Sequence, residues 1–575
     1  MAFTTEATEE SSTERGADDL LGPGRAIAAT LRGTLGPNGL DKMVIDRSGS
    51  VVVTNTGATV LDGLEIDAPI GRVIRDAIRT HARHVGDGTT TTALLVGELL
   101  DAADGLVERG LHPTSVVDGY ASAMSHARDA LDELTVPVDP GDERVREVAS
   151  TAVTGRWDAA SARRFADITV DALRSVDFDA ARLTLHAYPG GELADSERVT
   201  GILVDLDGSS TTVDGFGTDG RRTLADPTVA LVDGEVTTPT AEASGTVTVR
   251  SPDDLAAVRE HERAAESELV RSIADRDVDV LVCQKSINDA AKTELARAGV
   301  LPVERTRRDE FDAIARAADA TPVTAVADLE RDELGRAGSV RRRSVGGGTV
   351  VELSGLPGES HESLLLRGGT PHVAEETKRI VEDCLAVARH AASGGGVVPG
   401  GGAGMTAVFR AVADRASSVD DRSALALDAF AEAVTVIPRA LARNAGADPI
   451  DALVALRNRH HDGETAAGVA RSGAVRDMFD AGVVEPVAVP ARCLETAVRT
   501  AGLVLRVDET LDAKPIDGSG ADGDGHRGTG HSGGDGHGHA HGDGHGHGDG
   551  HAHAHGDGRG SGGGRDGGYP WALSH

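Results

Sequence analysis

The sequence predicts a multidomain protein in which helical segments at both ends of the ordered chain enclose an α/β region. Three observations predict this class. First, apolar residues recur at helical spacing over residues 16–136 and again between the 350–353 segment and Lys514. Second, two mostly apolar runs occupy the middle of the chain. Third, the composition changes abruptly after Pro515. At 575 residues the chain is long enough for several hydrophobic cores.

The first 136 residues are predicted to be mostly helical. The polar, acidic start of the chain, up to Asp19, has no apolar segment, so we expect neither a secretory signal nor a folded element there. A hairpin interrupts the helices, because the apolar runs 43–45 and 51–53 flank a Ser-Gly-Ser turn. The Pro- and Gly-containing stretch 136–141 marks the first boundary.

The middle of the chain alternates between helical and β-type patterns. A helix-rich segment at residues 145–199 comes first, and the charged segment 253–273 predicts a solvated helix with a thin apolar stripe. Strands are expected where β-branched residues cluster, at 199–204, 246–249, 278–283 and 300–303. The runs 278–283 and 300–303 predict buried parallel strands of an α/β layer.

The segment after Pro515 consists largely of Gly, His and Asp and contains eleven of the 22 histidines of the chain. It has almost no apolar residue to bury, so we expect disorder. Its His-Gly-His and His-Ala-His repeats are typical of loose Zn²⁺, Ni²⁺ or Cu²⁺ binding. A flexible, solubilising tail is the alternative interpretation, and the sequence leaves both open.

The charge balance excludes several classes of partner. The chain has 58 basic and 92 acidic residues, a formal charge of −34, and only five of its basic residues are Lys. Such a surface repels nucleic acid and anionic membranes. It suits a cytoplasm of molar salt, where the Debye length is roughly 3 Å and the self-repulsion is screened.

Cysteine usage and hydropathy indicate a cytoplasmic protein. Cys283, Cys384 and Cys493 lie far apart and lack C-x-x-C spacing, so we interpret them as buried apolar residues in a reducing compartment. No run approaches 18 apolar residues, and no membrane-spanning helix is expected.

The run VGDGTTTT at residues 85–92 is the strongest chemical signal in the chain. It places glycines, one carboxylate and consecutive hydroxyls directly before an apolar, helix-like segment, 93–100. Backbone N–H groups and hydroxyls at a helix N-terminus can donate to phosphate oxygens, and the carboxylate can hold the Mg²⁺ that bridges them. Gly-Asp-Gly also occurs in ordinary turns, so context decides between the two interpretations.

Two further segments suit a nucleotide site. The segment TLGPNGLDKM at 34–43 places a Gly-Pro turn after a helical stretch, and VVPGGGAG at 397–404 offers three consecutive glycines against which a base or ribose can lie. No G-x-x-x-x-G-K-[ST] motif occurs, which disfavours a P-loop NTPase.

These motifs resemble those of the group II chaperonins, the family of the thermosome and the eukaryotic cytosolic chaperonin, in a divergent haloarchaeal form. The resemblance runs through almost the whole ordered chain: TLGP at 34–37, DKM at 41–43, GDGTTT at 86–91, LHPT at 111–114, GY at 119–120, VCQK at 282–285, LRGGT at 366–370, VED at 381–383, VPGGGA at 398–403, DPID at 448–451 and GVVEP at 482–486.

The resemblance implies the chaperonin fold: a mainly helical equatorial domain, an intermediate hinge domain and an α/β apical domain with a helical protrusion, followed by the His/Gly/Asp-rich tail. The implied organisation is a disordered N-terminus (1–19), an equatorial domain (20–140 and 397–515), an intermediate domain (141–198 and 349–396), an apical domain (199–348) and the tail (516–575).

The resemblance also assigns roles at the nucleotide site. Asp383 corresponds to the carboxylate that activates the attacking water, Asp87 to the Mg²⁺ ligand and, weakly, Arg156 to the group that senses the γ-phosphate. Glu485 corresponds to a ribose-contacting carboxylate and Gly401 to the platform for base and ribose. The phosphate-binding residues implied are Leu35, Gly36, Pro37, Gly88, Thr89, Thr90 and Thr91.

The chain departs from the family pattern at several positions. The family's Asn-Asp-Gly is Asn55-Thr56-Gly57 here, so a neutral hydroxyl replaces an acidic group. Asn38 and Arg156 stand where Lys is usual, and Arg keeps the charge with a different geometry. Residues before Leu20 lack the aliphatic strand of the family, and Gly-Phe-Gly at 215–217 replaces a His-Pro-Gly-Met-type segment.

The leading hypothesis is therefore a cytoplasmic, ATP-dependent chaperone subunit that binds unfolded protein in a ring built from itself or from paralogues. Its cofactors are ATP and Mg²⁺, with K⁺ as an optional further ion. A second hypothesis is a divergent, slowly hydrolysing subunit that assembles with active paralogues, because Thr56 lacks a carboxylate. A third is a metal-binding protein that acts through its His-rich tail.

Overall fold

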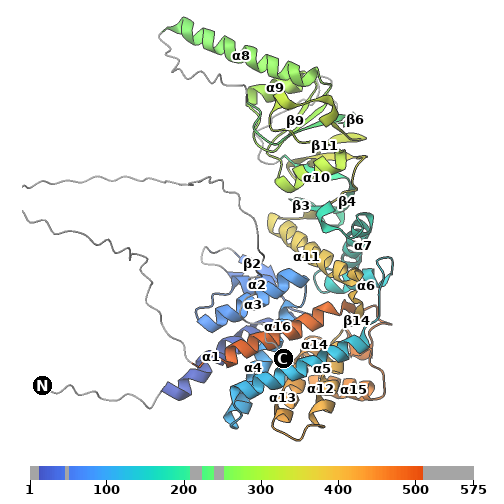
Figure 1. The fold of residues 1–575 in the computed structure, drawn as a ribbon. Helices are drawn as coiled ribbons and strands as arrows, with labels where there is room; N and C mark the ends of the chain where they lie inside the picture. The colour runs from blue at the N-terminus through green and yellow to red at the C-terminus, as the bar shows by residue number, and fades with distance from the viewer. Residues whose placement is uncertain (1–11, 46–48, 50, 207–222, 238–250, 509–575) are drawn as a thin grey trace, which may run out of the picture. The chain divides into compact units, whose positions relative to one another are not determined.

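The structure is a computed structural model that describes residues 12–45, 49, 51–206, 223–237 and 251–508 (Figure 1). The chain divides into two compact units, Met1–Thr510 and Leu511–His575. The second unit lies outside the described residues, as do three features singled out in the sequence: the His-rich tail, the β-type segment 246–249 and the Gly-Phe-Gly segment 215–217.

Helices from both ends of the first unit pack around the largest hydrophobic core in the described part of the chain. Helix α4 is buried on nearly every side, with Leu94, Leu95, Leu99 and Leu100 fully inaccessible, so its position is fixed by packing. The core helices are α1 (Ser12–Leu31), α2 (Gly57–Gly63), α3 (Pro69–Val85), α4 (Thr89–Glu108), α5 (Pro113–Leu134), α12 (Ala403–Ala416), α13 (Ser423–Val434), α14 (Val436–Asn444) and α16 (Ala488–Leu505).

Short strands border this helical core. Strands β1 (Lys42–Ile45) and β2 (Val51–Thr54) pair antiparallel with Ile45 opposite Val51, which confirms the predicted hairpin. Helix α15 (Pro449–His461) lies beside the antiparallel pair β15 (Ala467–Val469) and β16 (Val475–Asp477). Strands β14 (Val397–Pro399) and β17 (Val484–Pro486) also pair antiparallel, with Val398 opposite Glu485.

A second core lies between three helices and a three-stranded sheet. The helices are α6 (Arg144–Ala152), α7 (Ala159–Ser175) and α11 (Pro371–His390), and the sheet has the order β3 (Leu183–Pro189), β13 (Glu362–Gly368), β4 (Glu197–Thr200). Helix α11 starts directly after β13, where the Thr370 side chain caps it and Pro371 occupies its first turn. This helix therefore connects the sheet to the helical core.

The described residues of the α/β region form two four-stranded sheets. In the first, β8 (Val280–Cys283) and β9 (Leu301–Val303) are parallel, as the sequence predicts, and β7 (Thr228–Val232), which was not predicted, pairs parallel with β8. Strand β10 (Gly335–Arg336) is antiparallel to β7. The second has the order β5 (Ile202–Asp205), β12 (Gly348–Ser354), β11 (Ser339–Val345), β6 (Thr223–Ala225). The accompanying helices are α8 (Pro252–Ala274), which matches the predicted charged helix, α9 (Asp289–Arg297) and α10 (Arg308–Ala318).

The structure corrects three expectations. Helix α1 begins at Ser12, so residues 12–19 are helical and not disordered. The single β segment expected at 199–204 is two strands that separate at Gly201, where φ is 137° and a Cβ would lie 2.1 Å from the Leu353 carbonyl oxygen. The chain also leaves the α/β region only after β12, later than the boundary at residue 348 implied by the resemblance.

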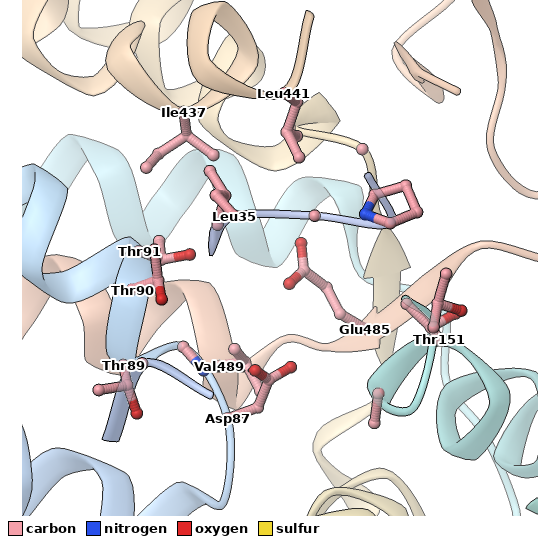
Figure 2. A pocket seen from close by; sticks show the side chains of 18 of the residues that line it. Leu35, Asp87, Thr89, Thr90, Thr91, Thr151, Ile437, Leu441, Glu485 and Val489 are labelled. Carbon is pink, nitrogen blue, oxygen red and sulfur yellow. Dashed lines mark hydrogen bonds between the residues drawn. The ribbon is translucent and has the colours of Figure 1, made fainter. Parts of the chain in front are cut away.

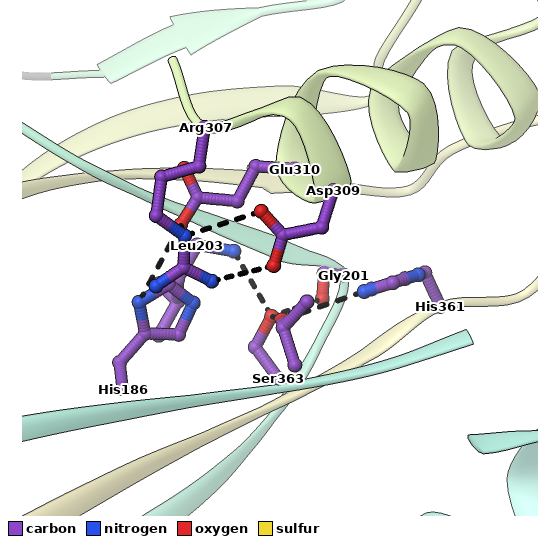
Figure 3. A network of polar contacts seen from close by, with 9 residues as sticks. His186, Gly201, Leu203, Arg307, Asp309, Glu310, His361 and Ser363 are labelled. Carbon is purple, nitrogen blue, oxygen red and sulfur yellow. Dashed lines mark hydrogen bonds and ion pairs between the residues drawn. The ribbon is translucent and has the colours of Figure 1, made fainter. Parts of the chain in front are cut away.

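A polar network joins α10 to strand β3 (Figure 3). The Arg307 guanidinium donates to both carboxylate oxygens of Asp309 and lies 3.3 Å from Glu310 Oε1. That same oxygen is 3.9 Å from His186 Nδ1, and both side chains are buried. Burial raises the pKa of Glu310 to about 7 and lowers the pKa of His186 to about 4. The imidazole is therefore neutral at neutral pH, and its contact with Glu310 is not an ion pair.

The expected burial of the cysteines is confirmed. Cys283, Cys384 and Cys493 are buried free thiols. Among the described residues, no helix is both long enough and apolar enough to span a bilayer.

Candidate functional site

A pocket of about 260 Å³ opens where the N-terminus of α4 meets the 34–37 loop, the β14–α12 turn and the side of α11 (Figure 2). Every site residue named from the sequence lines it: Leu35, Gly36, Pro37, Asp87, Gly88, Thr89, Thr90, Thr91, Arg156, Asp383, Gly401 and Glu485. These residues come from segments hundreds of positions apart, so the fold brings the whole predicted set together.

Residues 86–88 form the turn between α3 and α4, and Thr89, Thr90 and Thr91 make up the first turn of α4. Gly86 and Gly88 both adopt positive φ, 80° and 83°, which lets the chain reverse within three residues. A Cβ at Gly88 would lie 2.4 Å from the Cys493 sulfur, so this close approach also requires glycine. No side chain caps the N-terminus of α4. Its first N–H groups therefore remain available to an anionic ligand in the pocket.

The 34–37 loop lies against this helix end. The Thr34 and Thr90 hydroxyls are 3.2 Å apart, and Gly36 turns the chain with φ of 80°. Asn444, at the end of α14, holds the loop by donating from its side-chain amide to the carbonyl oxygens of Arg32 and Leu35, at 3.0 and 2.9 Å. The loop is thus fixed independently of any ligand.

Three carboxylates, Asp87, Asp383 and Glu485, line the pocket. Burial raises the pKa of Asp87. Burial, together with the charge of Asp87, raises the pKa of Asp383 to about 7 and that of Glu485 to about 8. Arg156 opposes the shift at both aspartates. The pocket therefore holds an excess of acidic groups that a cation would stabilise.

The described residues contain no ready-made cluster of three His, Cys, Asp or Glu ligands for a metal ion. Proteins commonly bind Mg²⁺ through one or two carboxylates while phosphate oxygens and water complete the octahedron. Asp87, adjacent to the free N–H groups of α4, is the carboxylate placed to do this.

The opposite side of the pocket is apolar (Figure 2). Leu35 meets Ile437 and Leu441 of α14 there, and Gly401, with φ of 62°, provides bare backbone at the β14–α12 turn. A flat apolar ligand such as a nucleobase suits this wall. Ile437 and Leu441 were not foreseen from the sequence, although their i, i+4 spacing does indicate a shared helix face.

Three of the departures from the family pattern, Asn38, Thr56 and Arg156, have different surroundings. Asn38 does not line the pocket, and it donates to the Arg471 carbonyl oxygen at 2.7 Å. Thr56 and Arg156 both line it, and the Arg156 guanidinium donates to the Thr56 hydroxyl at 2.9 Å and to the Asn55 side chain. The Arg156 guanidinium therefore lies next to Thr56, the position at which the family pattern has an acidic side chain.

Fold and pocket together define a multidomain protein whose binding site is assembled from both ends of the chain beside a helix that leads to an α/β region. Comparison with known proteins identifies the class. Residues 27–515 match the TCP-1/cpn60 chaperonin family. This chain therefore belongs to the TCP-1/cpn60 chaperonin family.

Named relatives agree with this assignment. The thermosome subunit alpha of Halobacterium salinarum is 37% identical over 524 residues, which cover 90% of this chain and 92% of the relative. The thermosome subunit of Methanopyrus kandleri is 36% identical over 502 residues, covering 86% and 91%. Thermosome subunit 1 of Haloferax volcanii is 36% identical over 524 residues, covering 90% and 92%.

Proposed function

We propose that this chain is a subunit of an ATP-driven chaperonin that binds non-native protein and assists its folding. The observation that carries the proposal is the uncapped N-terminus of α4, which faces a pocket lined by Asp87, Asp383 and Glu485. An exposed row of N–H donors beside several carboxylates suits a phosphate chain accompanied by a divalent cation.

Each side of the pocket has a role in this proposal. The N–H groups and hydroxyls of Thr89, Thr90 and Thr91 hold the phosphates, and Gly88, whose own N–H donates to Asp87 Oδ1 at 2.6 Å, leaves the helix end open to them. Asp87 would hold Mg²⁺, and Gly401 and Glu485 receive base and ribose. A bound Mg²⁺ neutralises phosphate charge and fixes the orientation of the phosphate chain. Asp383, which α11 brings to the side of the pocket, orients the attacking water and accepts its proton.

Helix α11 is the element through which nucleotide binding acts on the rest of the molecule. It carries Asp383 near its middle and starts directly after strand β13 of the three-stranded sheet. Contacts at Asp383 that form only with nucleotide bound shift the equilibrium between open and closed states. We assign the equatorial, intermediate and apical roles to the helical core, the second core and the α/β region, respectively.

Assembly into a ring, from this chain or with paralogues, is part of the proposal. Met43, Ile45, Val51 and Val53 are between 46% and 66% exposed and share one face of the β1–β2 hairpin. An exposed apolar face on a two-stranded sheet is unstable alone and favours contact with another subunit. We place the assembly in the cytoplasm.

A second candidate function is a slowly hydrolysing subunit. Thr56 brings no carboxylate to the pocket, and its hydroxyl contacts Arg156 and Glu376. Such a subunit binds ATP and contributes to the assembly while active paralogues hydrolyse.

The test compares full-length protein with Asp383→Asn in molar KCl, measuring ATP binding, ATP hydrolysis and refolding of a denatured reporter protein. We expect the variant to bind ATP normally and to lose hydrolysis by about 10²- to 10⁴-fold. Glu382→Gln, on the exposed side of the same helix, is the matched control and should retain both. Failure of the wild type to bind ATP contradicts the proposal.

Deleting residues 516–575 separates the chaperone from the metal-binding hypothesis. If the tail is accessory, the truncated protein refolds the reporter as well as the full chain does. Loss of the chain's activity together with its Zn²⁺ binding favours the tail as the functional part.

A further inference from the structure

Glu376 lies on α11 and does not line the pocket itself. It contacts Thr56 of the β2–α2 loop, which does line the pocket. Its Oε1 accepts hydrogen bonds from the Thr54 hydroxyl at 2.8 Å and the Thr56 hydroxyl at 3.0 Å. Both threonine side chains are buried, at 4% and 7% exposure. Two hydroxyls that donate to one carboxylate oxygen in a buried setting make a strong, directional anchor.

The anchor extends into the pocket through Thr56. The Thr56 hydroxyl gives its one proton to Glu376 and accepts from the Arg156 guanidinium at 2.9 Å. Arg156 lines the pocket together with Asp87 and Asp383. A relay of hydrogen bonds therefore runs from Arg156 through Thr56 to Glu376.

Glu376 also shares a helix face with Asp383. Seven residues are two turns of α-helix less about 20°, so the two side chains project the same way about 10 Å apart along the axis. Between them, Arg379 donates to the Thr59 hydroxyl at 3.1 Å, and beyond them the His390 ring contacts the His84 carbonyl oxygen at 3.0 Å. One face of α11 thus follows the pocket from the β2–α2 loop to the end of α3.

We propose that Glu376 is a positioning residue: by accepting from Thr54 and Thr56 it clamps α11 onto the β2–α2 loop, which keeps the Asp383 carboxylate in the pocket and aims Arg156 at the phosphates. This role rests on the proposed ATPase function. Nucleotide binding rests chiefly on the α4 N-terminus, and the clamp acts mainly on the hydrolysis step.

The first test is Glu376→Ala, measured by ATP affinity and by single-turnover hydrolysis of bound ATP in molar KCl. The expected result is an affinity within about threefold of wild type and a hydrolysis rate lowered at least about tenfold. Glu376→Gln keeps an acceptor oxygen and should lie between wild type and Glu376→Ala. Glu375→Ala removes the neighbouring exposed carboxylate and should match wild type.

A second pair of variants tests the relay. Thr56→Ser keeps the hydroxyl and should retain the rate, whereas Thr56→Val is nearly isosteric and should lose it. The double variant Thr56→Val with Glu376→Ala should be no slower than the slower single variant, because both break one unit. Additive losses, or equal rates in Thr56→Ser and Thr56→Val, overturn the proposal.

Hydrogen exchange provides a readout that needs no hydrolysis. With ATP bound, amides of residues 374–386 and 54–60 should exchange faster in Glu376→Ala and Thr56→Val than in wild type and the control variants. Unchanged exchange in the two clamp variants overturns the clamp even where hydrolysis is slow. If wild type binds and hydrolyses ATP but Glu376→Ala behaves like Glu375→Ala, only the clamp fails; if wild type does not bind ATP, the proposed function itself fails.

Discussion

Replacing Gly401 by Ala tests whether the bare backbone at the β14–α12 turn is a wall of the nucleotide site. A Cβ there would lie 2.8 Å from both the Met478 sulfur and the Val469 carbonyl oxygen, and 3.0 Å from the Val469 nitrogen. Met478 can rotate away, but Val469 cannot, because its N–H donates to the Gly401 carbonyl oxygen at 2.8 Å. The strand β15 must therefore shift if the substitution is accommodated.

Two costs add at this position. An L-residue at φ of 62° costs about 1–2 kcal/mol, and forcing a methyl group against packed backbone costs about 1–3 kcal/mol. The expected loss in unfolding free energy is about 2–5 kcal/mol. Gly446→Ala is the matched control: its φ is 76°, but a Cβ there would meet no atom within 4 Å, so only the first cost applies.

The assay is equilibrium binding of a fluorescent adenine nucleotide, together with thermal unfolding, both in molar KCl. Gly401→Ala should weaken binding at least about tenfold, which corresponds to 1.4 kcal/mol, whereas Gly446→Ala should bind as wild type. Equal nucleotide affinity in the two variants refutes the assignment of Gly401 as a wall of the site.

Three other predictions concern charge. The pKa of Glu310 is about 7 in the folded state against an ordinary value of 4.5, so the folded state binds the proton of this carboxyl more tightly than the unfolded state does. The free energy of unfolding should therefore fall as pH rises from about 4.5 through 7, by on the order of 3 kcal/mol. Unfolding experiments between pH 5 and 8 should show this pH dependence in wild type but not in Glu310→Gln. Under the slow-subunit candidate, Thr56→Asp combined with Glu376→Gln, which avoids two carboxylates at the 3.0 Å contact of residues 56 and 376, should raise steady-state ATPase at least about tenfold, and an already fast wild type rules that candidate out. With a formal charge of −34, the protein should melt at lower temperature when KCl falls from molar to about 0.1 M; an unchanged melting temperature contradicts the halophilic interpretation.

Local sequence signals predicted the parts of the fold that local interactions determine. The β1–β2 hairpin follows from two apolar runs around a turn, and β8 and β9 follow from short buried runs separated by a helix. The α4 N-terminus was predictable for the same reason, since glycine, hydroxyl and carboxylate side chains precede an uninterrupted apolar helix. The break at Gly201 was not, because it depends on the close approach of β12, about 150 residues later in the chain.

The candidate site shows the same division. The motifs named its phosphate and carboxylate residues, but Ile437, Leu441 and Asn444 come from a helix with no chemical signature, and only tertiary packing brings them to the 34–37 loop. Glu376 is a clearer case, since it meets Thr54 and Thr56 across more than 300 residues. Charged residues such as Glu375 and Glu376 on an amphipathic helix are typical of a solvated surface, so nothing in the sequence distinguishes Glu376.

The central claim is that Asp87 and the α4 N-terminus form an Mg²⁺-ATP site. The most direct test is calorimetric titration of ATP, with and without Mg²⁺, into wild type and Asp87→Asn in molar KCl. We predict that wild type binds one ATP per chain and that Mg²⁺ increases its affinity for ATP. In Asp87→Asn, Mg²⁺ should no longer increase the affinity, and the variant should unfold at the same temperature as wild type or at a higher one. Binding that is absent in wild type, or equally strengthened by Mg²⁺ in Asp87→Asn, contradicts the claim.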